Sequence, residues 1–439
     1  MHPTARRLLA VVSSALVLAA VVPPPSAEAS GVGQVGWWAG ETTQQCPTAT
    51  QGNCPRNLAV YTPAVWKALR DSRSALYLDL VYGVDYGPGA TRADGLQLVQ
   101  RARAEHIAVK AWLTAPFSDG TYANENNAAY EDRAVKALKA WSDQHQLGLK
   151  EAVLDLEFPA GYQPVLDATD PAKLRTLRAN VDPAHQCAAI RAYAQTAHWA
   201  ATHGLVLSST PVPFAVDDLD DGNMGLEDVL DIGPFLRTGY AHVYTQAYRT
   251  YSDTGADYVT HFISQTKAYF GSRAEISLGD TTMGPPYSGT ADELAHDVSL
   301  SVALGMRAIP IFDLDGAVGK YGAAGIKQIG DAAAHPLSPA QVAAATATPD
   351  PKTTLTLAFF QALGSAASGL SLTPNHWPTT CDVIAASTSR PGHPRTGGTP
   401  PTTAGRQLPL TGGAAPLWVL LLVVPAVVLR LSARPAGTP

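Results

Sequence analysis

The middle of the chain alternates between short apolar runs and longer segments with helical periodicity. The apolar runs, rich in branched and aromatic residues, predict buried strands at 35–40, 75–83, 107–116, 151–159, 205–213, 242–249, 274–280 and 307–316. Apolar positions spaced three and four apart predict helices at 62–72, 94–106, 131–145, 186–204, 256–271, 291–305 and 323–334. The fifth connection, 215–239, has only a short helical piece. Strand and helix alternating eight times predict an α/β fold in which a parallel sheet closes as a (β/α)8 TIM barrel.

The pattern changes on both sides of this alternating region and divides the chain into five segments. Residues 1–29 have a basic start, an apolar run and a small-residue cleavage site, which is typical of a secretory signal peptide. Residues 30–334 form the predicted barrel, and 335–386 a helical extension that we expect to pack on it. Residues 387–407 are a Pro/Gly/Thr-rich linker with little to bury, and 408–439 are a membrane-anchoring tail.

The tail resembles the cell-wall sorting signal of Gram-positive surface proteins. The motif LPLTG, with Leu408, Pro409, Thr411 and Gly412, precedes an apolar run at 414–429 and a basic end. The resemblance implies that a sortase cleaves after Thr411 and links it to peptidoglycan. The alternative is a plain C-terminal membrane anchor, for which the apolar run is short. Both interpretations place the protein outside the cell and tethered to it.

Composition narrows the classes of partner. The net charge is -6 and no basic stripe occurs, so nucleic acid is not an expected partner. Because the signal peptide predicts export, the four cysteines are expected to lie in an oxidising compartment. No CxxC spacing occurs, so disulfides are favoured over metal ligation. Cys46 and Cys54 are near neighbours and are expected to pair, which leaves Cys187 for Cys381. No cofactor and no metal are predicted.

Polar side chains recur on the predicted inner face of the barrel strands. Alternation sends Leu76, Leu154 and Val243 toward the helices, and Pro310 and Phe312 with them, so that their neighbours point inward. The inward set from strands two, four, six and eight comprises Tyr77, Asp79, Asp155, Glu157, Tyr244, Gln246, Tyr248, Asp313 and Asp315. Because active sites of such barrels lie at the carboxyl ends of the strands, this convergence predicts a site there.

Some of these residues have a plainer interpretation. A single Asp at a strand end, such as Asp79 or Asp315, often caps a loop. Trp37 and Trp112 are either a platform for a sugar ring or part of the core. The acidic segment DDLDDG at 217–222 hints at calcium, but Leu219 interrupts the alternating ligand pattern, which favours a solvated loop.

The D-x-E at the end of strand four, a Tyr near the end of strand six and a polar strand eight resemble glycoside hydrolase family 18 and its relatives. The resemblance implies that Glu157 is the general acid, that Asp155 orients an N-acetyl group of the substrate and that Tyr248 helps to hold it. The family has Asp at two further positions of this run, which here are Lys150 and Val153. The resemblance therefore favours a sugar-hydrolase-like barrel over any particular family.

Three functional hypotheses follow. The first is a wall-anchored glycoside hydrolase acting on a polysaccharide or glycan, including one that contains N-acetylhexosamine. Repulsion from Asp155 and the apolar strand would favour the protonated form of Glu157 that an acid needs. The second is an inactive carbohydrate-binding or adhesive protein, which the missing Asp residues favour. The third is a hydrolase of another type with Asp280 as the nucleophile. The expected substrate contacts are Asp79, Trp37, Trp112, Tyr244, Gln246, Asp280, Asp313 and Asp315.

Overall fold

The structure is a computed structural model of the whole chain. It describes residues 33–40, 57–81, 93–115, 120–162, 180–221, 224–370 and 381. The signal peptide, the linker, the sorting motif and the pair Cys46 and Cys54 lie outside the described residues, so the predictions made for them stay predictions.

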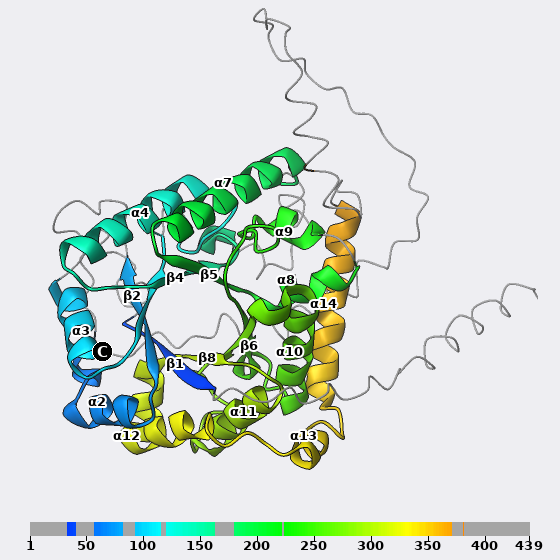
Figure 1. Cartoon of the computed structure of the whole chain (residues 1–439). Helices are drawn as coiled ribbons and strands as arrows, with labels where there is room; N and C mark the ends of the chain where they lie inside the picture. Colours follow the sequence, from blue (N-terminus) through cyan, green and yellow to red (C-terminus); the bar gives the residue numbers. More distant parts are fainter. Residues whose placement is uncertain are drawn as a thin grey trace, which may run out of the picture.

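Eight parallel strands close into a barrel in the order of the sequence, from β1 beside β2 round to β8 beside β1 (Figure 1). This confirms the predicted (β/α)8 fold. The strands are β1 Gln34–Ala39, β2 Ala75–Val81, β3 Val109–Leu113, β4 Glu151–Leu156, β5 Val206–Pro211, β6 Val243–Tyr248, β7 Ala274–Gly279 and β8 Ala308–Phe312.

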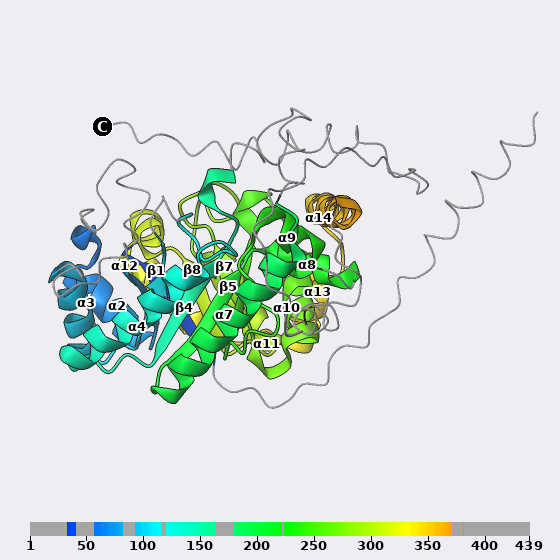
Figure 2. The ribbon, with the colours of Figure 1, turned by 90° about the horizontal axis from the view of Figure 1, so that it is seen from above.

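Helices surround the barrel, and the two views agree that they form an outer layer (Figures 1 and 2). The α-helices are α2 Pro63–Asp71, α3 Ala93–Ala104, α4 Ala128–Gln144, α7 Pro183–Thr202, α8 Pro213–Asp218, α9 Gly225–Leu230, α10 Ala256–Phe270, α11 Asp292–Ala303, α12 Leu314–Ala332, α13 Pro339–Ala345 and α14 Pro351–Leu370. Single 3-10 turns are η2 Leu58–Val60, η4 Ala160–Tyr162, η5 Leu219–Asp221, η6 Arg249–Tyr251 and η7 Gly271–Arg273. Among its described residues, the fifth connection contains the short α8, η5 and α9 and no longer helix, as its pattern predicts.

Side chains on the strands separate into two packed sets. Leu76, Leu78 and Leu80 pack outward against the helices in the larger core. Tyr77 packs inward with other aromatic residues in a second core that fills the barrel. A side chain at Gly36 would lie 2.2 Å from the Tyr77 ring, so glycine on β1 makes room for it. The alternation expected of a barrel strand is thereby observed.

Strand eight departs from the prediction in length and in orientation. It ends at Phe312, and Asp313 caps α12 by accepting a hydrogen bond from the backbone of Gly316. Phe312 packs inside the barrel, whereas Ile309 and Ile311 face the helices. The predicted outward orientation of Phe312 is therefore wrong. An Asp at a helix N-cap satisfies a backbone N–H that would otherwise lack a partner, which explains why the helix begins here.

The amino ends of the strands are closed by a charged network inside the barrel. Lys110 Nζ donates to the hydroxyls of Tyr77 and Tyr244, each at 2.9 Å, and lies 3.0 Å from Glu151 Oε2. Glu151 Oε1 also accepts from Tyr244 and from Ser208. Burial lowers the pKa of Lys110, but Tyr77 and Glu151 outweigh it and hold that pKa above its usual value. This end of the barrel is therefore filled by satisfied polar groups.

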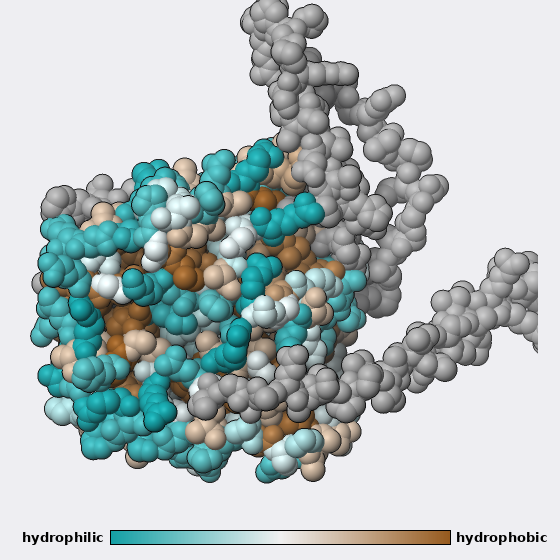
Figure 3. All heavy atoms as spheres, in the orientation of Figure 1, coloured by the Kyte–Doolittle hydropathy of each residue, from teal (hydrophilic) through white to brown (hydrophobic). Residues whose placement is uncertain are grey.

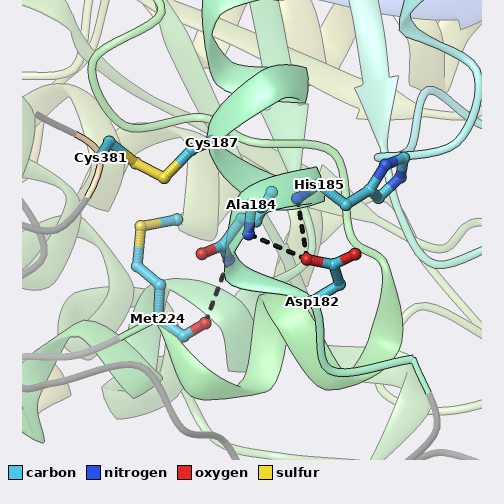
Figure 4. The surroundings of a disulfide bond; sticks show 7 residues. Asp182, Ala184, His185, Cys187, Met224 and Cys381 are labelled. Carbon is cyan, nitrogen blue, oxygen red and sulfur yellow. Dashed lines mark hydrogen bonds between the residues drawn. A yellow bond between two sulfur atoms is a disulfide. The ribbon is translucent and has the colours of Figure 1, made fainter. Parts of the chain in front are cut away.

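The C-terminal helix α14 lies against α8, α9 and α10 on the outside of the barrel (Figures 1 and 2). Beyond it, Cys381 is disulfide-bonded to Cys187 on α7, across 194 positions of sequence (Figure 4). The predicted pairing of these two cysteines is confirmed. Beside the bond, Asp182 caps α7 by accepting from the backbone N–H groups of Ala184 and His185.

Removing this disulfide should destabilise the barrel. We expect the Cys187→Ser/Cys381→Ser variant to lose about 2–4 kcal/mol of unfolding free energy, because the unfolded chain regains the freedom of a long loop. Chemical denaturation measures the loss. Reductant should lower the stability of the wild type toward that of the variant and leave the variant nearly unchanged. Equal stability of both proteins without reductant would contradict the prediction.

Candidate active site

The candidate site lies at the carboxyl ends of the strands, where one amide contacts two carboxylates. Nε2 of Gln246 on β6 lies 2.9 Å from Asp155 Oδ1 and 3.2 Å from Glu157 Oε1. The same nitrogen lies 3.3 Å from the carbonyl oxygen of Thr210 on β5. Asp155, Glu157 and Gln246, all predicted as inward residues of the mouth, are thus brought together.

The backbone beside strand four fixes how the two carboxylates are presented. Asp155 belongs to β4 and is only 5% exposed, whereas Glu157 follows the end of the strand and is half-buried. Ala123 lies alongside, donating its N–H to Asp155 O at 2.7 Å and accepting from Glu157 N at 3.3 Å. The extended pairing continues past the strand end, which keeps both side chains on the same side. Glu157 is therefore the carboxylate nearer to solvent.

Aromatic rings fill the barrel below and beside these carboxylates. Phe312 stacks on Tyr248 with ring centroids 5.9 Å apart, and its edge contacts Trp112 at 6.0 Å. Tyr248 also contacts Tyr251, a half-buried residue of η6, at 5.5 Å. The Tyr248 hydroxyl lies 3.3 Å from Ser277 Oγ. Burial raises the pKa of Tyr248 well above its usual value, so the hydroxyl stays protonated and can donate.

Two of the predicted contact residues lie elsewhere. Trp37 packs in the core between the barrel and the helices, and its neighbour Trp38 occupies the barrel interior beside Tyr77 and Trp112. Tyr244 does point inward, but its hydroxyl belongs to the network around Lys110 at the opposite end of the barrel. Neither Trp37 nor Tyr244 can therefore contact a ligand at the mouth.

Asp79 and Trp112 are neighbours on β2 and β3. Their Cα atoms are paired in the strand register, and Asp79 is buried with Thr114 Oγ1 donating to it at 3.4 Å. The indole N–H of Trp112 is buried and has no hydrogen-bond acceptor among the described residues. A buried donor without a partner is uncommon, which makes this position a candidate contact for a ligand acceptor.

A second group of carboxylates follows strands seven and eight. Asp280 Oδ1 accepts from the backbone and the hydroxyl of Thr282 at 2.6 and 2.5 Å. Burial raises the pKa of Asp313 to about 7, and the charges of Asp280 and Asp315 contribute to the rise. Burial also raises the pKa of Asp315, in the first turn of α12, to about 6. Asp280 and Asp313 are tied to their own loop or helix and buried, so their oxygens are less available to a ligand than those of Glu157.

The acidic segment before α9 is used in local contacts. Asp217 Oδ1 lies 2.8 Å from His261 Nε2, and Asp218 Oδ2 accepts from the backbone of Leu226 at 3.1 Å. Asp220 accepts from the Tyr269 hydroxyl at 2.7 Å. Across the described residues, no three His, Cys, Asp or Glu side chains are arranged to hold a metal ion.

A groove of about 530 Å³ lies between α11 and α12, lined in part by His296, Lys327 and His335, on the outer helical layer and not at the mouth. None of the helices described is both long and apolar enough to cross a membrane. On the face of the molecule that Figure 3 shows, hydrophobic patches are bordered by hydrophilic residues.

Comparison with known proteins yields no family. No family model and no curated protein match the chain. Among solved structures, the glycoside hydrolase domain of PgaB (BpsB) from Bordetella bronchiseptica is 12% identical, with a TM-score of 0.40, covering 68% of this chain and 98% of that one. The YdjI aldolase from Escherichia coli K12 is 11% identical, with a TM-score of 0.29, covering 69% and 88%. The HMG-CoA lyase from Brucella melitensis is 11% identical, with a TM-score of 0.33, covering 69% and 97%. At these values the three structures lend no weight to a particular activity.

Titration of Asp313 should make stability depend on pH. The Asp313 carboxyl keeps its proton up to about pH 7 in the folded state but only up to about pH 4 in the unfolded state. Its contribution to the free energy of unfolding is therefore complete below pH 4 and is lost as the pH rises to 7. Asp313→Asn keeps a capping oxygen and removes the titration. Relative to the wild type, we expect the variant to gain about 4 kcal/mol between pH 4 and pH 8 in denaturant melts. The matched control is Asp331→Asn, a half-buried position near the end of the same helix, where Asp331 forms an ion pair with Lys327. Parallel pH profiles for Asp313→Asn and the wild type would contradict the prediction.

Proposed function

We propose that the chain is an extracellular, wall-anchored glycoside hydrolase that cleaves glycosidic bonds of a polysaccharide or glycan. The observation that carries the proposal is the meeting of Asp155, Glu157 and Gln246 at the carboxyl ends of the strands of a barrel whose interior is packed with aromatic rings. Carboxylates and an amide can bind sugar hydroxyls or an acetamido group, and aromatic faces suit the apolar faces of sugar rings.

In the proposed mechanism, Glu157 protonates the leaving glycosidic oxygen. It is the more exposed of the two carboxylates and lies just beyond the strand, where a substrate can reach it. Asp155 is held by the Gln246 amide and acts on the substrate next to the cleaved bond. The hydroxyl of Tyr248, kept protonated by burial, is a donor for the same substrate group.

Asp155 and Glu157 cannot act as an opposed pair. Glycosidases with two catalytic carboxylates place them across the sugar ring, about 5 Å apart if retaining and about 6.5–9.5 Å if inverting. Neighbours on a single strand lie on one side of the bond. Asp280 and Asp313 are buried and bonded to their own segments, which disfavours them as nucleophiles. We therefore favour the acetamido group of the substrate as the nucleophile, and N-acetylhexosamine as part of the substrate.

One contact favours an alternative, a carbohydrate-binding or adhesive protein without activity. The Gln246 amide donates to Glu157 as well as to Asp155. A hydrogen bond to a carboxylate stabilises its charged form, which opposes the role of a proton donor. A binding protein has no such requirement, so activity assays separate the two functions.

Glu157→Gln should lower kcat by roughly 100-fold to 10,000-fold, because it removes the proton donor and keeps the shape of the side chain. Asp155→Asn should lower kcat less. Release of reducing sugar from N-acetylhexosamine polymers measures both. The matched control is Glu293→Gln, an exposed Glu on α11. Full activity of Glu157→Gln would remove it from the mechanism, and equal hydrolysis of a glycan without acetamido groups would exclude participation of that group.

Anchoring should depend on the LPLTG motif. We expect Thr411→Ala to abolish covalent attachment to peptidoglycan, because the acyl transfer proposed for this tail uses the Thr carbonyl within a recognised motif. The measurement is the protein that stays with cell walls after hot detergent extraction. Thr402→Ala, in the linker, is the control and should leave attachment unchanged. Undiminished wall-linked Thr411→Ala protein would favour a plain membrane anchor.

A further inference from the structure

A series of aromatic contacts connects the C-terminal helix to the end of strand four. Phe360 of α14 is 8% exposed and contacts Phe214 of α8 with ring centroids 5.8 Å apart. Phe214 in turn stacks on Phe158 at 6.4 Å, with the ring planes 25° apart. Phe158 directly follows Glu157 in the sequence. Two ring contacts therefore separate α14 from the residue next to the candidate acid.

The start of α14 is bonded to a second segment of the mouth. Thr353 Oγ1 donates to Asp257 Oδ1 at 2.8 Å and accepts from the backbone N–H of Gly255 at 3.1 Å. The backbone N–H of Asp350 donates to Asp257 Oδ2 at 2.9 Å. Gly255 ends the segment between β6 and α10, and Asp257 lies in the first turn of α10. The same segment contains Tyr251, which contacts Tyr248. The helix thus contacts segments that precede and follow β6, the strand of Gln246.

Close approach and a covalent bond limit the freedom of this helix. A side chain at Gly364 would lie 2.0 Å from Asp218 Oδ1, so glycine allows α14 to lie close against α8. Farther along the chain, the bond between Cys381 and Cys187 ties the extension to α7. The helix is therefore bonded near its start, and the chain beyond its end is tied to α7 at Cys381.

We propose that α14 is a positioning element of the candidate site, with Phe360 holding Phe214, and Phe214 holding Phe158, so that the Glu157 carboxylate stays at the Gln246 amide. The expected effect of α14 on catalysis rests on the proposed function, whereas its effect on the position of Glu157 does not. Neither Phe214 nor Phe360 touches the reacting atoms; both act through Phe158. Phe360→Leu leaves a gap that the neighbouring rings relax into, and displacements at catalytic groups are costly in rate.

The first experiment is a double-mutant cycle on hydrolysis. Phe360→Leu should lower kcat about 10-fold with KM within about twofold, because ground-state binding is kept while the acid is displaced. In a Phe158→Leu background the same change should have little further effect. The control is Phe270→Leu, a buried Phe of α10 that packs on Phe235 away from α14. Equal kcat losses from Phe360→Leu and Phe270→Leu, or fully additive effects with Phe158→Leu, would overturn the inference.

The second experiment does not require activity. The protein is labelled with carbon-13 at the side-chain carboxyl of Glu, and the Glu signals are followed by NMR as the pH changes. The Glu157 signal is identified as the one that is missing from the spectrum of Glu157→Gln. The midpoint of its titration reports the surroundings of the Glu157 carboxylate. We expect Phe360→Leu to move that midpoint by about 0.5 pH unit or more and Phe270→Leu to leave it in place. An unmoved midpoint in Phe360→Leu would overturn the positioning role. A wild type that hydrolyses no glycan, with a midpoint that does move, would reject the hydrolase and retain the positioning role.

Discussion

Closure of eight parallel strands into a ring is the constraint on which the rest of the structure depends. A closed ring has no free edge, but every second side chain must fit inside it. Here the interior holds Lys110, whose burial would be costly without partners. Glu151 and the hydroxyls of Tyr77 and Tyr244 supply those partners at the amino ends of the strands. Since that end is filled, the candidate site lies where the strands end.

The strand count and the order of the fold could be predicted from the sequence because strand and helix patterns differ strongly in this chain. The orientation of strands two, four and six could be predicted because each alternates between two chemically distinct sets of side chains. Strand eight lacks that contrast, since Ile309, Ile311 and Phe312 are all apolar. The cap at Asp313 was also hidden, because an Asp after an apolar run fits a strand end and a helix start equally well.

The level of each inward side chain along the barrel axis could not be predicted either. Alternation assigns a side chain to a face, but its level along the axis depends on how far each strand is shifted relative to its neighbours. Tyr244 is paired with Glu275 near the start of the strands, whereas Gln246 is paired with Ser277 one level higher. Two residues of one strand therefore belong to the closed end and to the candidate site. Lys110 was missed for the same reason, although a charged residue at an inward position within a strand is a usable signal.

The contact between Gln246 and Glu157 is compatible with both binding and acid catalysis, and its geometry shows why. The amide contacts Glu157 Oε1 at 3.2 Å, while its shorter contact, 2.9 Å, is with Asp155. A protonated Glu157 can accept through its carbonyl oxygen and keep its O–H for another acceptor. With Asp155 ionised and Glu157 protonated, the pair carries one negative charge and the repulsion between adjacent carboxylates disappears. Under the proposed function, the amide would then hold Asp155 as the charged member, and the more exposed Glu157 would be the member that delivers a proton.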